Sequence, residues 1–307
     1  MTPDGPATPT PGTELADARY RDFDSWTTAE MVAAMFEGQQ AAVAAVDEAL
    51  AAIAAAVDAA VPGLLRGGRI IYAGAGTSGR IAVQDGAELT PTFDWPPERI
   101  VYLLAGGLMA LTQSVEGAED KDVEGARAIA GARLTSDDVV VGVAASGTTP
   151  YTVGAIRAAN TAGAVTIAVA NNPDSPLLKN ARYPILVQTG AEIVAGSTRM
   201  KAGTAQKVVL NLFSTALMTR MGRVYRGLMV HLRARNEKLR RRGKAIIAEI
   251  VGCSNDEAAR HLENAGGDVK NAILLGFGLT ADKAAAMLAR HQGNLRAVLH
   301  ELGPRDA

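Results

Sequence analysis

Two hydroxyl side chains, Thr77 and Ser78, lie in a glycine-rich turn where the sequence predicts a strand followed by a helix. Ile70–Ala73 is a short apolar run between glycines, which is typical of a buried parallel strand. The turn Gly74-Ala-Gly-Thr-Ser-Gly79 follows it, and helical spacing then resumes. A helix that begins here leaves backbone N–H groups unpaired at the positive end of its dipole. The sequence therefore predicts that Gly76, Thr77 and Ser78 bind a phosphate group.

The three glycines Gly74, Gly76 and Gly79 also match the G-x-G-x-x-G fingerprint of dinucleotide-binding proteins, which is a weak signal by itself. A nicotinamide site should add an acidic residue at the end of the next strand, about 20 residues further on. Glu98 has this spacing, but it precedes the next apolar run instead of ending it. We therefore favour a phosphate monoester and predict no cofactor.

Two further hydroxyl clusters have similar positions. Ser146-Gly147-Thr148-Thr149 follows an apolar run and precedes Pro150, which suits the first turn of a helix. Ser197 and Thr198 precede another predicted helix, where such residues are by default N-caps. Cationic neighbours of this pair favour contact with an anion instead. The predicted substrate-binding residues in these clusters are Ser146, Gly147, Thr148, Thr149, Ser197, Thr198 and Lys201.

Five apolar segments alternate with helical ones, which implies right-handed βαβ units and a mostly parallel sheet. Ligands of such sheets bind beyond the carboxyl ends of the strands, where two of the hydroxyl clusters fall. The expected strands are Ile70–Ala73, Ile100–Ala105, Asp138–Ala144, Val165–Ala170 and Tyr183–Val187. Fold class is thus α/β, with a parallel sheet flanked by helices.

The ends of the chain differ from this α/β region. Residues 1–13 hold four prolines and are predicted to be a disordered tail. A short helix capped by Thr27 or Thr28 is expected through Phe36. From Gln39 to Leu64, apolar residues recur at three- and four-residue steps. This heptad-like stripe predicts either an ordinary covering helix or one that packs along a partner subunit.

The C-terminal 50 or so residues contain a repeat with an offset of 26, in which Ser254-Asn-Asp-Glu-Ala-Ala matches Thr280-Ala-Asp-Lys-Ala-Ala. Each copy reads as an N-cap, a helix, a glycine turn and a second helix. The sequence therefore predicts a small helical appendage built from a duplicated hairpin.

Composition excludes several classes of function. A net charge of −1 over 307 residues gives no global field that recruits nucleic acid or a membrane. The single cysteine, Cys253, excludes an internal disulfide framework, and none of the four histidines lies at metal-ligand spacing, so no metal is predicted. Neither a long apolar run nor a basic-then-apolar N-terminus is apparent, so we expect a soluble, cytoplasmic protein. The basic stretch 233–244 is predicted to be a solvated helix face.

Four motifs together resemble those of N-acetylmuramic acid 6-phosphate etherases. They are Gly74-Ala-Gly-Thr-Ser-Gly-Arg80, Val115-Glu-Gly-Ala-Glu-Asp120, Ala144-Ala-Ser-Gly147, and Gly190-Ala-Glu through Gly196-Ser-Thr-Arg-Met-Lys-Ala-Gly-Thr-Ala-Gln-Lys207. The resemblance implies a sugar isomerase (SIS) domain over residues 14–243, a small UBA-like helical domain over 244–307, and a homodimer. It also implies cleavage of the D-lactyl ether of N-acetylmuramic acid 6-phosphate, which gives N-acetylglucosamine 6-phosphate and D-lactate in cell-wall sugar recycling.

Two catalytic residues, Glu88 and Glu119, are implied by the same resemblance. An alkyl ether does not hydrolyse readily at neutral pH, so lactate must leave from a carbon beta to the aldehyde of the opened sugar. One carboxylate removes the C2 proton while a neutral carboxylic acid protonates the departing oxygen, which requires two different pKa values. The resemblance makes Glu88 the acid and Glu119 the base, an order that the sequence alone does not fix. From the residues alone, a glutamate is by default a surface helix residue. Glu88 departs from this default because it lies in the helix that begins at the anion loop, in a weakly charged stretch, whereas Glu119 has the acidic neighbours Glu116 and Asp120.

Two departures from the etherase pattern bear on substrate preference. Asp85-Gly-Ala-Glu-Leu-Thr-Pro-Thr92 stands where these enzymes usually have Asp-Ala-Ser-Glu-Cys-Pro-Pro-Thr, and Thr148 stands where they usually carry an arginine. Two alternatives stay open. One is a non-catalytic sugar-phosphate-sensing regulator of the glucokinase regulatory protein type, and the other is an aldose–ketose phosphate isomerase. Release of free D-lactate distinguishes the three.

Overall fold

The computed structural model describes residues 10–303, whose contacts form two compact units. The first comprises the chain up to Gly86 together with Glu98–Phe213, and the second comprises Ala87–Pro97 together with the chain from Ser214 onward. Each unit has its own hydrophobic core. The predicted boundary at 243/244 stays a prediction.

A five-stranded parallel sheet in the order β2-β1-β3-β4-β5 forms the centre of the first unit. Each strand coincides with a predicted one to within a residue at either end, so the predicted α/β fold is confirmed. β1 and β3 are buried along their whole length, because apolar strands with β-branched residues can be covered on both faces. The strands are β1 (Ile70–Gly74), β2 (Ile100–Leu104), β3 (Val139–Val143), β4 (Val165–Ala170) and β5 (Tyr183–Leu186).

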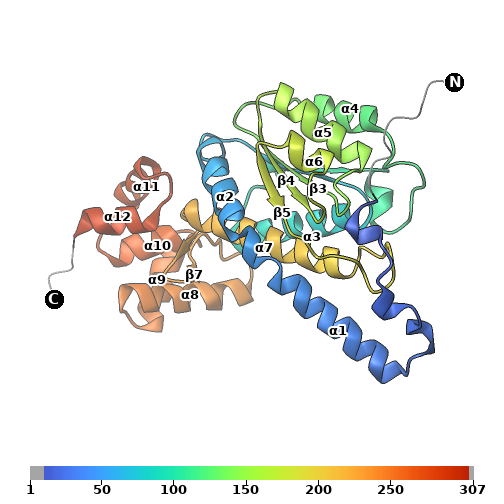
Figure 1. Ribbon diagram of the computed structural model, residues 1–307. Helices are drawn as coiled ribbons and strands as arrows, with labels where there is room; N and C mark the ends of the chain where they lie inside the picture. The colour runs from blue at the N-terminus through green and yellow to red at the C-terminus, as the bar shows by residue number, and fades with distance from the viewer. Residues whose placement is uncertain (1–9, 304–307) are drawn as a thin grey trace. The chain divides into compact units, whose positions relative to one another are not determined.

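Helices cover both faces of this sheet (Figure 1). One layer consists of α4 (Asp122–Ala132), α5 (Pro150–Thr161) and α6 (Pro176–Asn180). The opposite layer contains α2 (Leu50–Leu65) and the parts of α3 (Gly76–Phe93) and α7 (Lys201–Arg220) that belong to this unit. Because the strands are parallel, their carboxyl ends share one edge, and the loops that follow them gather there.

The N-terminal helices differ from the prediction of a short helix followed by a continuous one from Gln39 to Leu64. α1 spans Thr28–Ala44, with Thr27 as its N-cap, and a 3-10 turn at Asp47–Ala49 separates it from α2. The heptad-like stripe is therefore interrupted. In α2 its residues Ile53, Val57 and Leu64 are buried, whereas Val43 at the end of α1 is 48% exposed.

The helical region 28–65 is long enough to span a membrane and contains an 18-residue window with a mean hydropathy of 1.6. A core helix of a water-soluble fold passes the same test. Here the apolar residues of α2 pack toward the sheet, because α2 contacts β3, β4 and β5.

The predicted disordered tail, 1–13, lies mostly outside the described residues, but the prediction of disorder is wrong for its last residues. Gly12–Glu14 forms a 3-10 helix in which Thr13 is fully buried. The Thr13 N–H donates to Oδ1 of Asn172 at 3.3 Å, and the Asn172 side-chain amide donates back to Oγ1 of Thr13 at 3.0 Å. These contacts make the last residues of the predicted tail part of the folded unit.

The second unit is mainly helical. Its four C-terminal helices show the predicted duplication, because Ser254 and Thr280 cap the first helix of each hairpin, and Asp268 and Asn294 cap the second. The helices are α8 (Glu237–Val251), α9 (Asn255–Asn264), α10 (Val269–Gly276), α11 (Ala281–Arg290) and α12 (Leu295–Leu302), beside a two-stranded sheet of β6 (Val224–Tyr225) and β7 (Leu228–Met229).

Candidate active site

The turn after β1 depends on its glycines. Gly76 has φ +50°, and a Cβ on Gly79 would lie 2.3 Å from the Leu104 side chain and 2.9 Å from the backbone carbon of Gly74. α3 begins at Gly76, so Thr77 and Ser78 are first-turn residues and not part of a turn before the helix, as the sequence suggested. Their backbone N–H groups belong to the four that a helix leaves unpaired.

The turn after β3 has a comparable design. Gly147 has φ +69°, and a Cβ there would lie 2.2 Å from Oγ of Ser175, so only glycine fits. Oγ of Ser146 accepts hydrogen bonds from the Thr148 backbone N–H at 3.2 Å and from the Thr148 hydroxyl at 3.0 Å. Pro150 then begins α5, as predicted.

The third hydroxyl cluster precedes α7, but the cap of that helix is Glu192. Its carboxylate is fully buried and accepts the backbone N–H groups of Lys201 and Ala202, each at 2.9 Å. The Lys201 ammonium donates to the carbonyl oxygen of Ala191 at 2.9 Å. The sequence offered Ser197 or Thr198 as the default cap but favoured contact with an anion for this pair. The residue that does cap the helix, Glu192, stands in the etherase-like motif Gly190-Ala-Glu.

A cavity of about 350 Å³ lies among these loops, at the carboxyl ends of the strands. It brings together Glu119 with seven of the ten predicted substrate-binding residues, while Gly147, Ser197 and Lys201 do not line it. Two acidic side chains that the sequence did not single out, Glu14 and Asp120, also face it. The full lining is Glu14, Ala75, Gly76, Thr77, Ser78, Glu119, Asp120, Ala145, Ser146, Thr148, Thr149, Pro150, Gly196 and Thr198.

The loop that carries Glu119 is hydrogen-bonded to two helices. The carbonyl oxygen of Glu119 accepts the Tyr151 backbone N–H at 2.9 Å. Arg80 in α3 donates to the carbonyl oxygens of Ala110 at 2.8 Å and Gln113 at 3.2 Å, in the same loop between β2 and α4. The backbone of this loop is therefore tied to both helices that begin at a hydroxyl cluster, while the Glu119 side chain stays exposed.

Glu88 does not line this cavity. It is exposed on the later turns of α3, twelve residues after Gly76. At 1.5 Å per residue, about 18 Å of helix separates the two positions.

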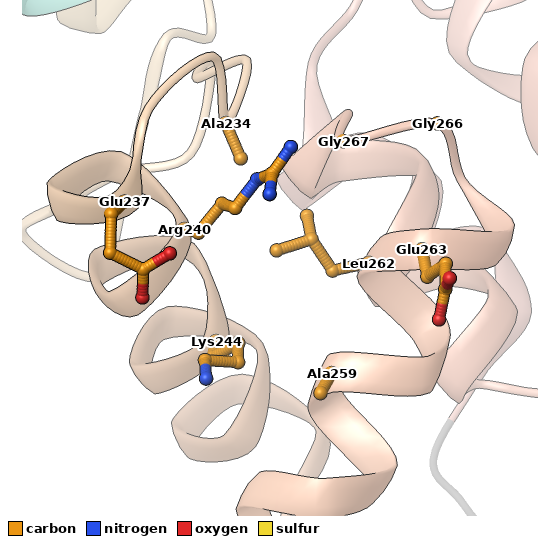
Figure 2. Close-up of a pocket in the computed structure, with 9 residues that line it drawn as sticks. All are labelled: Ala234, Glu237, Arg240, Lys244, Ala259, Leu262, Glu263, Gly266 and Gly267. Carbon is orange, nitrogen blue, oxygen red and sulfur yellow. The ribbon is translucent and has the colours of Figure 1, made fainter.

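A larger cavity, about 450 Å³, lies in the second unit between α8 and α9 (Figure 2). Arg240 and Lys244 of α8 and Leu262 of α9 line it, with Glu237 and Glu263 also on its wall. Its lining has neither a hydroxyl cluster nor a strand end, so the smaller cavity is the candidate active site.

Known proteins match this chain over nearly its whole length. A protein from Deinococcus radiodurans named N-acetylmuramic acid 6-phosphate etherase is 49% identical over 290 residues, which cover 94% of this chain and 95% of the relative. The etherase of Halalkalibacterium halodurans is 45% identical, with 94% of this chain and 98% of the relative covered. This chain belongs to the N-acetylmuramic acid 6-phosphate etherase family.

Two family models match parts of this etherase family member. Residues 52–160 match the N-terminal SIS domain of glucokinase regulatory protein, and residues 122–216 match the SIS domain. A phosphoheptose isomerase from Francisella tularensis is similar in structure, with a TM-score of 0.48 and 20% identity over 63% of this chain and all of that one.

One departure from the usual etherase sequence has a structural explanation. A Cβ on Gly86, where related enzymes usually have alanine, would lie 2.7 Å from the Tyr102 ring and 2.8 Å from the Tyr72 ring. These two rings stack with centroids 6.2 Å apart, and the Tyr72 hydroxyl donates to Oδ2 of buried Asp85 at 2.8 Å. Gly86 therefore makes room for the tyrosine pair. Burial raises the pKa of Tyr72, so it stays a hydrogen-bond donor.

Proposed function

We propose that this protein cleaves the D-lactyl ether of N-acetylmuramic acid 6-phosphate to give N-acetylglucosamine 6-phosphate and D-lactate. The observation that carries this proposal is the single cavity that joins Glu119 to the hydroxyls of Ser78, Ser146 and Thr198. Membership of the etherase family supports the same activity, and neither the regulator nor the isomerase alternative is favoured.

In the proposed site, the first turn of α3 and the Ser146 loop bind the phosphate. Both supply neutral donors, and the α3 helix dipole favours an anion at its N-terminus. This contact fixes one end of the opened sugar, so that the C2 hydrogen and the C3 ether oxygen are presented to the two carboxyl groups.

The reaction then proceeds as an elimination followed by a hydration. Ionised Glu119 takes the C2 proton, the C2–H electrons form the C2=C3 double bond, and the C3–O bond breaks. Neutral Glu88 gives its proton to the lactate oxygen. Water afterwards adds its hydroxyl to C3 while its remaining proton goes to Glu88, and Glu119 returns its proton to C2, which restores the carboxylic acid and carboxylate pair.

About 18 Å of helix separates Glu88 from Gly76, which lines the cavity at the start of α3. This distance exceeds the reach of a glutamate side chain. We therefore propose that Glu88 serves the cavity of a second copy. An exposed apolar face on α1 supports a homodimer, because Val32 is 55% and Phe36 63% exposed. The enzyme is proposed to act in the cytoplasm on a small-molecule sugar phosphate, without a cofactor, a nucleic acid or a membrane partner.

The test is release of D-lactate from N-acetylmuramic acid 6-phosphate by the purified protein. We expect stoichiometric formation of D-lactate and N-acetylglucosamine 6-phosphate, and no release from unphosphorylated N-acetylmuramic acid at the same concentration. A regulator would release no lactate, and an isomerase would form a ketose phosphate instead. Absence of lactate would contradict the proposed activity.

A further inference from the structure

Glu14 lines the cavity although it belongs to an N-terminal segment for which the sequence predicted no chemical role. Every other residue in the lining lies at or after Ala75. Glu14 ends the 3-10 helix Gly12–Glu14, and its backbone N–H donates to the carbonyl oxygen of Pro11 at 2.9 Å. A short N-terminal segment thus supplies a carboxylate to a site that is otherwise built from loops after strands.

This segment is anchored to those loops through Thr13 and not through Glu14. The Asn172 side-chain amide, which donates to Oγ1 of Thr13, also donates to the carbonyl oxygen of Ala145 at 2.9 Å. The Gly196 backbone N–H donates to the carbonyl oxygen of Thr13 at 3.2 Å. Ala145 and Gly196 both line the cavity. The backbone next to Glu14 is therefore fixed to two walls of the site, and its side chain is not needed for that.

The carboxylate of Glu14 lies close to the Gly196 turn. A Cβ on Gly196 would be 2.8 Å from Oε2 of Glu14, and Gly196 has φ +73°, so this position both needs glycine and leaves room for the carboxylate. Within residues 10–303, no hydrogen bond or ion pair to the Glu14 side chain is present. It faces the cavity with its acceptor oxygens available to a ligand.

We infer that Glu14 binds the sugar part of the substrate, by accepting a hydrogen bond from a hydroxyl or from the acetamido N–H. This inference rests on the proposed function. An ionised carboxylate only accepts hydrogen bonds and repels a phosphate, so it does not contribute to the phosphate subsite. Hydroxyl and amide N–H groups are the donors that the sugar offers. Glu14 is thus a specificity-determining residue that distinguishes a sugar phosphate from phosphate alone.

Titration calorimetry tests this with three probes: N-acetylglucosamine 6-phosphate, glucose 6-phosphate and inorganic phosphate. For Glu14→Ala and Glu14→Gln we expect the dissociation constant of N-acetylglucosamine 6-phosphate to rise about ten- to a hundred-fold, with the larger effect for alanine. The dissociation constant of inorganic phosphate should stay the same or fall, because a negative charge has been removed. Glu48→Gln, which removes one charge from an exposed position outside the cavity, is the matched control and should change neither.

The three probes also separate the two possible donors. A loss for both sugar phosphates identifies a hydroxyl as the partner of Glu14, and a loss for the acetamido sugar alone identifies the amide N–H. Unchanged sugar-phosphate affinity would overturn the inference, as would a parallel loss of inorganic phosphate, which indicates collapse of the phosphate loop. If the parent protein binds neither phosphate nor sugar phosphate, the proposed function itself fails and the inference fails with it.

Discussion

The backbone N–H of Tyr151 donates a hydrogen bond of 2.9 Å to the carbonyl oxygen of Glu119. Tyr151 is the second residue of α5, and the Ser146 loop leads directly into that helix. The candidate base and one candidate phosphate loop are therefore connected by a single backbone contact. A change in either loop is expected to alter the distance between the Glu119 carboxylate and the C2 hydrogen of a substrate whose phosphate is bound, which general acid–base catalysis tolerates poorly.

The two glutamates are predicted to fail in different ways when replaced. Glu119→Gln should abolish both lactate release and exchange of the C2 hydrogen with solvent deuterium, because no base remains. Glu88→Gln should block lactate release while C2 exchange persists, since the base is intact. Each loss should be about 10²–10⁴-fold. Mass spectrometry of the recovered sugar phosphate and a lactate assay measure the two steps separately.

Glu116→Gln is the matched control for the pair, because Glu116 is an exposed neighbour of Glu119 that does not line the cavity. It should retain parental lactate release and exchange. Near-parental lactate release by Glu119→Gln or Glu88→Gln would disprove the two-carboxylate mechanism. If C2 exchange is lost in Glu88→Gln and persists in Glu119→Gln, Glu88 is the base and Glu119 the acid.

The hydroxyl loops are predicted to hold the phosphate. Ser78→Ala and Ser146→Ala should each raise KM for the sugar phosphate, because a hydrogen bond to a charged group contributes about 1.5–3 kcal/mol. Steady-state kinetics measure the effect, and the inhibition constant for inorganic phosphate should rise in parallel. Ser114→Ala, at an exposed position outside the cavity, serves as control. If neither variant changes KM or phosphate inhibition, the phosphate binds elsewhere.

Mixing two inactive variants tests whether the site is shared between two copies. A dimer of one Glu88→Gln chain and one Glu119→Gln chain contains one site with both glutamates intact and one with neither, if each site takes Glu88 from the partner. Random re-association of equal amounts should therefore restore about a quarter of parental activity, since about half of the dimers are mixed. Each variant mixed with itself is the control. No restoration in demonstrably mixed dimers would place both glutamates of one site on one chain.

Acidification is predicted to destabilise the second unit through His231. Burial, together with the charges of Lys270, Arg223 and Arg233, lowers the pKa of His231 to about 3. Between pH 6.5 and 3 the unfolded chain therefore binds a proton that the folded chain does not, and the free energy of unfolding falls as the pH falls through this window.

This pH dependence can be followed by urea unfolding in a Trp26→Phe background, where fluorescence reports Trp95, a buried residue of the second unit. His231→Asn should reduce the loss of stability between pH 6.5 and 4.5, and His300→Asn, at an exposed position, should not. An identical pH profile for the parent and His231→Asn would show that another group controls the acid sensitivity.

The sequence alone located the strands and most of the hydroxyl side chains that line the candidate cavity. Apolar runs such as Ile70–Gly74 have a clear signal because a strand covered on both faces excludes polar residues along its whole length. Hydroxyls directly after such runs meet at one edge, since parallel strands end together. The helix break at Asp47–Ala49 left no comparable signal. The flanking residues are alanine-rich and favour helix throughout, so packing of α2 on the sheet decides where α1 ends.

Only the tertiary structure showed that Glu14 faces the cavity and that Lys201 does not. Glu192 caps α7 although it lies nine residues before Lys201 in the sequence, because the unpaired backbone N–H groups at a helix start need acceptors from elsewhere in the fold. The Lys201 ammonium donates to a carbonyl oxygen and does not line the cavity. Glu14 lies about 60 residues before the end of β1 in the sequence, yet it lines the cavity. Hydrogen bonds of Thr13 with Asn172 and Gly196 fix the backbone beside it. Such long-range hydrogen bonds follow no local spacing, so no pattern along the chain predicts them.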